Sequence, residues 1–198
     1  MRRFVYPLIP ALALLIAMPA ASATAAAFQQ PEGEQEQQVY DENADAAEEI
    51  KAALETAMKE NTRVLIQWGA NWCGWCKKLH ELFQSNRQIS RKLLYEYEIV
   101  YVDIGRFDKN LDLAGRFGAD LRANGVPFLT VLASDGTVIT NQETGSLEVG
   151  DAHDPARVME FLETHQADYL DAEVLLADAF RRAGQEEKRV FLTFGAPW

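Results

Sequence analysis

Two cysteines separated by two residues stand where an apolar run gives way to an amphipathic one, and this feature limits the possible folds most. Residues 64–68 are mostly β-branched or aromatic and are followed by Gly69, which predicts a buried strand. After Cys76, apolar residues recur at intervals of three and four, which predicts a helix. Cys73 and Cys76 therefore lie where a strand ends and a helix begins.

This position affects the chemistry of the two thiols. The first turn of a helix offers unpaired N–H groups and the positive end of the helix dipole, and both favour a thiolate over a thiol. Cysteines three residues apart on that turn come within disulfide range. Two cysteines are too few for a disulfide scaffold, so their spacing indicates either a redox pair or half of a metal site.

Composition narrows the class of protein further. A chain of 198 residues with 48% hydrophobic residues can bury one core and carry appendages. Its formal net charge of −11 argues against binding to nucleic acid and against binding to an anionic membrane surface. We expect no bound cofactor.

The N-terminus is predicted to be a signal peptide that covers residues 1–25. Arg2 and Arg3 form a basic start, and the apolar residues 8–18 are too few to span a bilayer. Small-residue cleavage sites follow, ending at Ala23, Ala25 and Ala27. We therefore expect a mature protein with no membrane anchor, in the periplasm or another extracytoplasmic compartment where disulfides persist. The alternative is an uncleaved anchor.

A flexible tether and one domain are predicted next. Residues 26–45 are rich in Gln and Glu and have little to bury, which is typical of a tether. The domain, residues 46–167, shows helix, strand, helix, strand, helix, hairpin and helix in that order. Helices are expected from residue 46, after 76, over 90–96 and 110–121, and from 155; strands over 64–68, 99–104, 126–132 and 137–140. This order implies an α/β fold with a mixed central sheet and helices on both faces.

Three features in this order resemble the thioredoxin-like superfamily: Trp-Cys-Gly-Trp-Cys-Lys at residues 72–77 after a buried strand, Gly-Val-Pro at residues 125–127, and the hairpin that follows. The chain looks most like exported bacterial members of the thiol–disulfide interchange kind, over residues 46–167. The resemblance implies a three-layer thioredoxin-like fold and a protein-disulfide oxidoreductase. In that role Cys73 would be the nucleophile and Cys76 the resolving thiol.

The same resemblance implies the rest of the site. Trp72, Gly74 and Trp75 would flank the cysteines. Val126 and Pro127 would offer backbone to an extended substrate segment, with Pro127 following a cis peptide and lying against the disulfide. The implied partners are protein thiols or disulfides and an upstream redox protein.

Two residues depart from the pattern of the superfamily. Many members carry a buried acid at the position of Gln67, where it helps to move the proton of the resolving cysteine. Gln67 cannot titrate, so proton transfer here must use water or another group. Trp75 stands where the best-known reductants have Pro, and its backbone N–H is available to donate to a Cys73 thiolate, which would lower the thiol pKa. The direction of electron flow is therefore open.

A second class of function is a non-catalytic binding module, or a carrier of copper or zinc. Cys73, Cys76 and His80 form a C-x-x-C-x-x-x-H pattern, and Cys76 and His80 share one helix face. With no further Cys or His nearby to complete a site, we predict no metal centre. The intact cysteine pair at a helix start favours the oxidoreductase.

The C-terminal residues repeat the pattern of the start of the domain. Residues 46–72 and 172–198 align without a gap when the chain is shifted by 126 residues, and their apolar positions agree. We therefore predict that residues 168–198 are the helix–strand start of a second thioredoxin-like repeat, truncated one residue before the equivalent of Cys73. The alternative is a chance match between two generic helix–strand units.

Overall fold

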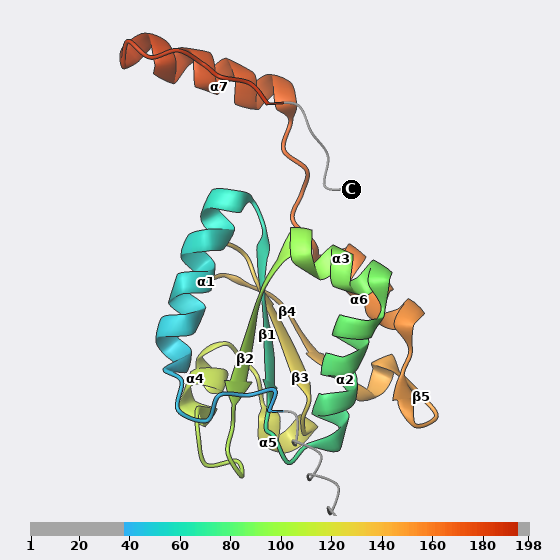
Figure 1. Cartoon of the computed structure of the whole chain (residues 1–198). Helices are drawn as coiled ribbons and strands as arrows, with labels where there is room; N and C mark the ends of the chain where they lie inside the picture. Colours follow the sequence, from blue (N-terminus) through green and yellow to red (C-terminus); the bar gives the residue numbers. More distant parts are fainter. Residues whose placement is uncertain (1–37, 194–198) are drawn as a thin grey trace, which may run out of the picture. The chain divides into compact units, whose positions relative to one another are not determined.

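The computed structural model of the chain describes residues 38–193 (Figure 1). The predicted signal peptide, residues 26–37 of the predicted tether, and residues 194–198 lie outside the described residues. Within the described part, no helix is long and apolar enough to cross a membrane.

Four strands form the central sheet of the domain, in the order β2-β1-β3-β4. β1 pairs with β2 in parallel and with β3 antiparallel, and β3 pairs with β4 antiparallel, so the predicted mixed sheet is confirmed. Both edges of β1 are thereby paired, which fits the burial of every residue of the strand after Arg63. The strands are β1 (Arg63–Gly69), β2 (Tyr97–Asp103), β3 (Phe128–Leu132) and β4 (Val138–Glu143).

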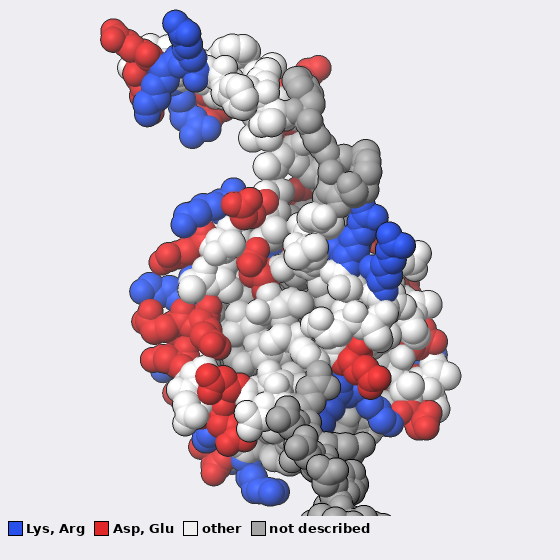
Figure 2. All heavy atoms as spheres, in the orientation of Figure 1, with Lys and Arg blue, Asp and Glu red and all other residues white. Residues whose placement is uncertain are grey.

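One face of the sheet packs against a first group of helices. Successive strand residues point to opposite faces, so Val64, Ile66 and Trp68 of β1 all enter this core. Each large side chain buried there stabilises the fold by about 1.5–3 kcal/mol. The outward side of the longest helix of this group carries acidic side chains (Figure 2). The helices are α1 (Ala46–Glu60), α4 (Leu111–Arg116) and α5 (Leu121–Asn124).

The opposite face carries a second core and the helix that begins at the two cysteines. Leu65 and Gln67, which alternate with the residues of the first core, point to this side. Figure 1 shows helices on both sides of the sheet, as the sequence predicts. The helices of this second face are α2 (Gly74–Ser85), α3 (Arg87–Glu96) and α6 (Pro155–His165).

Two local predictions are corrected by the structure. The helix expected over residues 110–121 is split into α4 and α5, because Gly118 has a φ of +72° and Asp120 caps the N-terminus of the second piece. A short hairpin of β5 (Glu148–Val149) and β6 (Ala152–His153), preceded by the 3-10 turn η1 (Gly145–Leu147), was not predicted. Strands of two residues leave no periodic signal in a sequence.

The described end of the predicted tether is held on the domain. Tyr40 is only 1% exposed, although it lies in a Gln- and Glu-rich stretch. The Asn71 side chain accepts hydrogen bonds from the backbone N–H groups of Val39 and Tyr40, both at 3.0 Å. The tether prediction is therefore wrong for residues 38–45, because one buried aromatic ring and three paired backbone groups anchor this segment.

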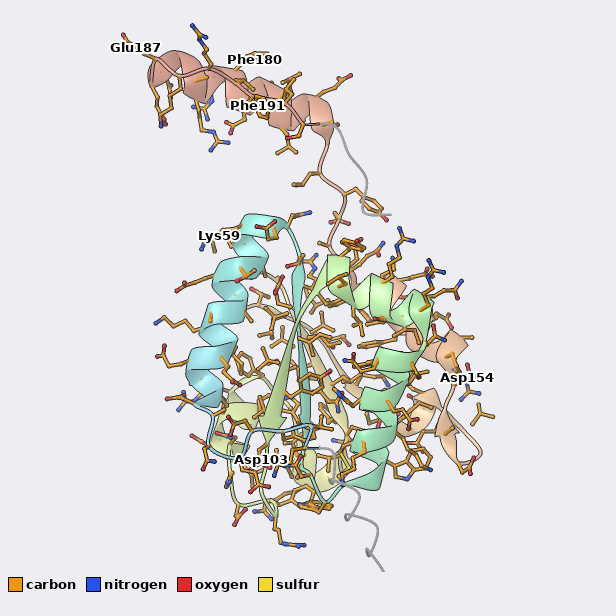
Figure 3. The ribbon with its side chains drawn as sticks, in the orientation of Figure 1. Lys59, Asp103, Asp154, Phe180, Glu187 and Phe191 are labelled. Carbon is orange, nitrogen blue, oxygen red and sulfur yellow. A yellow bond between two sulfur atoms is a disulfide. The ribbon has the colours of Figure 1, made fainter. Side chains whose placement is uncertain are left out.

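The C-terminal helix forms as expected, but the strand predicted after it does not. α7 (Ala172–Gln185) begins at the N-cap Asp171 and buries none of its residues. Phe180, labelled in Figure 3, is 59% exposed. Residues 188–193 form no strand, and the remaining residues of the predicted strand lie outside the described part. The second repeat stays a prediction.

Candidate active site

The two cysteines lie at the start of α2, as the sequence predicts. After Gly69 ends β1, the backbone N–H of Cys73 donates to the carbonyl oxygen of Ala70 at 3.0 Å and closes a short turn. Cys73 has extended dihedral angles, φ −83° and ψ 107°, and is the N-cap of the helix. Its sulfur therefore points at the first, unpaired N–H groups of α2, where negative charge is stabilised.

Cys73 and Cys76 form a disulfide, and their exposure differs. Their Cα atoms are 5.2 Å apart, a separation that one turn of helix provides. Cys73 is 5% exposed and Cys76 is fully buried. The Cys73 sulfur is therefore the one nearer to an incoming thiol or disulfide.

The backbone donor to Cys73 is not the one that the sequence suggested. The N–H of Cys76, rather than that of Trp75, donates to the Cys73 sulfur, with an N–Sγ distance of 3.1 Å. An N-cap side chain accepts from the second or third residue of the helix, and Cys76 is the third residue of α2. Trp75 instead contacts two neighbouring side chains. His153 Nε2 lies 3.2 Å from its carbonyl oxygen, and Lys78 Nζ lies 4.4 Å from the centre of its ring.

The segment before β3 lies against the disulfide. The peptide bond between Val126 and Pro127 is cis, so this implication of the resemblance is confirmed. The carbonyl oxygen of Val126 is 3.6 Å from the Cys73 sulfur. Thr144 holds the segment in place, because its hydroxyl donates to the carbonyl oxygen of Pro127 at 2.8 Å.

Trp72 and Gly74 border the cysteines on the solvent side. Trp72 is 46% exposed, and its indole N–H donates to the carbonyl oxygen of Gly105 at 2.7 Å. Its ring packs against Phe107 with centroids 6.1 Å apart, so the ring is fixed although half of it faces water. Gly74 is exposed, and a Cβ added to it would meet no atom within 4 Å. The cysteine pair thus has an open side with a rigid aromatic border.

The inner side of the pair contains a residue that sequence reasoning missed. Gln67 Nε2 donates to the Tyr40 hydroxyl at 2.6 Å and to the carbonyl oxygen of Cys76 at 3.3 Å. Tyr40 comes from the segment that precedes α1, and burial raises the pKa of its hydroxyl well above the ordinary value. The available signal was that Tyr40 is an aromatic residue alone in a polar stretch.

His80 packs against an aromatic ring one turn after Cys76. Its ring lies 5.1 Å from that of Tyr101, and burial lowers the pKa of His80. In the part of the chain that the structure describes, no three His, Cys, Asp or Glu side chains are grouped as metal ligands would be.

Comparison with known proteins agrees with this architecture. Residues 43–134 match the model of a family described as thioredoxin-like. The crystal structure of a disulphide isomerase from Xylella fastidiosa Temecula1 is 30% identical, with a TM-score of 0.58, and the alignment covers 65% of this chain and 96% of that one. The chain belongs to the thioredoxin-like family. A search of curated proteins found no match.

Other thioredoxin-like structures are more distant. The C-terminal domain of DsbD from Neisseria meningitidis, in its oxidised form, is 22% identical, covering 62% of this chain and 97% of that one, with a TM-score of 0.43. A thioredoxin from Thermus thermophilus is 17% identical, covering 58% and 81%, also with a TM-score of 0.43. These two add nothing to the assignment. A thioredoxin-like fold with a Cys-x-x-Cys disulfide at a helix start supports protein-disulfide oxidoreductase activity.

Proposed function

We propose that this protein is an exported thiol–disulfide oxidoreductase that exchanges disulfides with protein substrates through Cys73. The observation that carries the proposal is the Cys73–Cys76 disulfide at the start of α2, in which Cys73 is 5% exposed and Cys76 is fully buried. The relative from Xylella fastidiosa is described as a disulphide isomerase, which is an activity of the same class.

The exchange proceeds in two thiol–disulfide exchange steps. A substrate thiolate attacks the sulfur of Cys73, the Cys73–Cys76 bond breaks, and Cys76 leaves as a thiolate. A second substrate thiolate then attacks the substrate sulfur of the mixed disulfide, and Cys73 leaves as a thiolate. The substrate is oxidised to a disulfide and the cysteine pair is reduced to two thiols. Run backward, the same steps reduce a substrate disulfide.

The open side of the pair is the proposed substrate surface. Trp72 and Trp75 supply apolar area next to the disulfide, and Gly74 leaves room for a substrate chain to approach. The backbone at Val126 and Pro127 is proposed to align an extended substrate segment beside Cys73, since the Val126 carbonyl oxygen lies 3.6 Å from that sulfur. An upstream redox protein would use the same surface.

Export is proposed from the N-terminal sequence. Arg2 and Arg3, followed by a short apolar run and small-residue sites, are typical of a cleaved signal peptide. N-terminal sequencing of protein purified from the periplasm of a bacterial host tests this. A new terminus just after Ala23, Ala25 or Ala27 would support export, and an intact Met1 terminus in the cytoplasmic fraction would contradict it.

Reduction of insulin disulfides by the purified protein, with dithiothreitol as the electron source, tests the activity itself. The protein should accelerate insulin reduction, and the Cys73→Ser variant should not. Equal rates with and without the protein would overturn the proposal. Equilibration with glutathione buffers then gives the direction of electron flow: a reduction potential of about −270 mV is that of a reductant, and one of about −120 mV is that of an oxidant.

A further inference from the structure

Tyr40 is brought to the inner side of the disulfide by the residue that precedes the active-site motif. Asn71 accepts from the N–H groups of Val39 and Tyr40, and its Nδ2 donates to the carbonyl oxygen of Tyr40 at 2.9 Å. These three bonds fix the backbone on either side of the Tyr40 side chain. The ring of Tyr40 also packs edge-on against Tyr101, with centroids 6.0 Å apart. Tyr40 is therefore as firmly placed as a residue of the core.

The Tyr40 hydroxyl and the Cys76 sulfur line the same small space over Gly69. A Cβ added to Gly69 would collide with that hydroxyl and would lie 2.8 Å from the sulfur. Tyr40, Cys73 and Cys76 are grouped as one buried cluster. The glycine that ends β1 therefore leaves room for a contact between the hydroxyl and the sulfur.

The hydrogen bond from Gln67 determines how the hydroxyl can act. The amide of Gln67 donates to the Tyr40 oxygen, so this oxygen is an acceptor and its own proton is left to donate. Within residues 38–193, this proton donates no hydrogen bond. A disulfide sulfur is a weak acceptor, but a buried thiolate is a strong one, since an ionised acceptor roughly doubles the strength of a hydrogen bond.

We propose that the Tyr40 hydroxyl donates a hydrogen bond to the Cys76 sulfur when the disulfide opens and thereby stabilises the Cys76 thiolate. Tyr40 is thus a positioning residue for the resolving thiol, in a site where Gln67 cannot act as an acid. The inference rests on the proposed function, because it concerns the thiolate that the exchange releases. Tyr40 stabilises that thiolate when it leaves and, in the reverse direction, when it attacks Cys73.

The other ionisable groups around Cys76 leave Tyr40 as the best-placed donor. His80, on α2, packs edge-on against Tyr101. The Tyr101 hydroxyl is buried without a partner among the described residues and is the rival donor. Asp103, at the end of β2 (Figure 3), pairs with Lys109 at 3.0 Å. Burial raises the pKa of Tyr101 to about 12 and raises that of Tyr40 further, so both hydroxyls keep their protons at neutral pH.

A thiolate titration of a single-cysteine protein tests the proposal. The chain has two cysteines, so Cys73→Ser leaves Cys76 as its one thiol. Thiolate absorbance against pH then gives the pKa of Cys76 directly. Adding Tyr40→Phe should raise this pKa by about one unit, a tenfold loss of thiolate at a given pH below it, because a donor to an ionised group is removed.

Two matched variants separate this role from a loss of stability and from the rival donor. Tyr97→Phe also removes a buried hydroxyl, one that donates to the carbonyl oxygen of Leu162 at 2.6 Å in the other core, and should leave the Cys76 pKa unchanged. Tyr101→Phe should also leave it unchanged. An unchanged pKa in Tyr40→Phe, or an equal or larger rise in either matched variant, would overturn the proposal.

A second measurement uses the protein with both cysteines. Reduction of its disulfide by dithiothreitol should be roughly threefold slower in Tyr40→Phe, because a less acidic thiol leaves more slowly. An unchanged rate would count against the proposal. The titration needs no protein substrate, so a shifted pKa with no insulin reduction would overturn the proposed function alone. Normal insulin reduction with an unshifted pKa would overturn the role of Tyr40 alone.

Discussion

Cys73 and Cys76 share one disulfide, yet their surroundings differ in where the contacts come from. The Cys73 sulfur accepts a hydrogen bond from the backbone N–H of Cys76, in its own helix, and Cys73 directly follows the exposed Trp72 in the chain. Cys76 is fully buried, and its sulfur lies with the Tyr40 hydroxyl over Gly69; Tyr40 precedes α1 in the sequence.

The two sulfurs therefore have different tasks in one reaction; Cys73 carries the outer sulfur and Cys76 the inner one. The outer sulfur is activated by the helix start, which any chain with this local sequence would build. The inner sulfur is controlled by groups that the fold brings together from β1 and from the residues before α1. Substitutions on the outer side should therefore change attack and substrate binding, whereas those on the inner side should change thiol chemistry and stability.

The largest expected effect comes from exchanging each cysteine for serine. Both Cys73→Ser and Cys76→Ser should lower insulin reduction by about a thousandfold or more, because the exchange needs both sulfurs. Only Cys76→Ser should accumulate mixed disulfides, since its outer thiolate attacks and nothing resolves the product. Non-reducing gels and mass spectrometry identify the linked cysteine. Mixed disulfides that accumulate on Cys76 in the Cys73→Ser variant would show instead that Cys76 is the attacking thiol.

Alkylation should distinguish the two thiols of the reduced protein. Iodoacetamide should label Cys73 and leave Cys76 unlabelled, because Cys76 is buried. The labelling rate should rise with pH to a plateau and reach half its maximum below the free-cysteine pKa of about 8.5. Mass spectrometry of peptides from a pH series measures both. Earlier labelling of Cys76, or a midpoint above that value, would contradict the assignment.

Gly69→Ala should destabilise the inner side by about 1–3 kcal/mol, because the added methyl meets both the Tyr40 hydroxyl and the Cys76 sulfur. Urea unfolding measures the change. Gly74→Ala is the matched control, since nothing lies within 4 Å of a Cβ there and alanine favours a helix start over glycine. Equal losses in both variants would show that the inner space is not tightly filled.

Asn71→Ala should cost about 1–3 kcal/mol and loosen residues 38–40, because three backbone groups lose their partner. Hydrogen exchange at the amide of Tyr40 should accelerate together with the loss of stability in urea. Asn124→Ala is the control: this exposed side chain donates to the carbonyl oxygen of Asp120, and its loss should cost under about 0.5 kcal/mol. Unchanged exchange at Tyr40 would mean that its ring alone holds the segment.

The smallest effect is expected at the outer border. Trp72→Ala should raise KM for a protein substrate by about three- to tenfold, with little change in kcat, because we propose that the exposed ring binds substrate and takes no part in the sulfur chemistry. Tyr95→Ala removes another exposed aromatic ring, on α3, and should leave KM unchanged. A fall in kcat instead of a rise in KM would place Trp72 in control of the Cys73 thiol.

The local part of the site was predictable from the sequence. The strand before Cys73, the helix after it and the position of both cysteines follow from periodicity over about fifteen residues. The mixed sheet with helices on both faces followed from the order of elements, and the cis bond before Pro127 from the resemblance. In the disulfide, capping geometry makes the N–H of Cys76, and not that of Trp75, the donor to the Cys73 sulfur.

The inner side of the site could not be predicted in this way. The sequence near Tyr40 shows only an aromatic residue in a polar stretch. Its partners Gln67 and Asn71 come after α1 in the chain, whereas Tyr40 comes before it. A lone aromatic in a polar stretch buries its ring only if the fold offers a space, and Gly69 provides that space only after β1 and α2 have packed.

The two aligned segments, residues 46–72 and 172–198, show the same limit of prediction from sequence. α1 and α7 share a pattern of apolar residues, and both form helices, because helix hydrogen bonds join residues four apart within one segment. β1 is a strand between two neighbours, whereas residues 188–193, with the corresponding pattern, form none. The sequence alone determined the helices and the place of the cysteines. Strand formation and the inner contacts of Cys76 were decided by tertiary structure, because their hydrogen bonds and packing need partners from elsewhere in the chain.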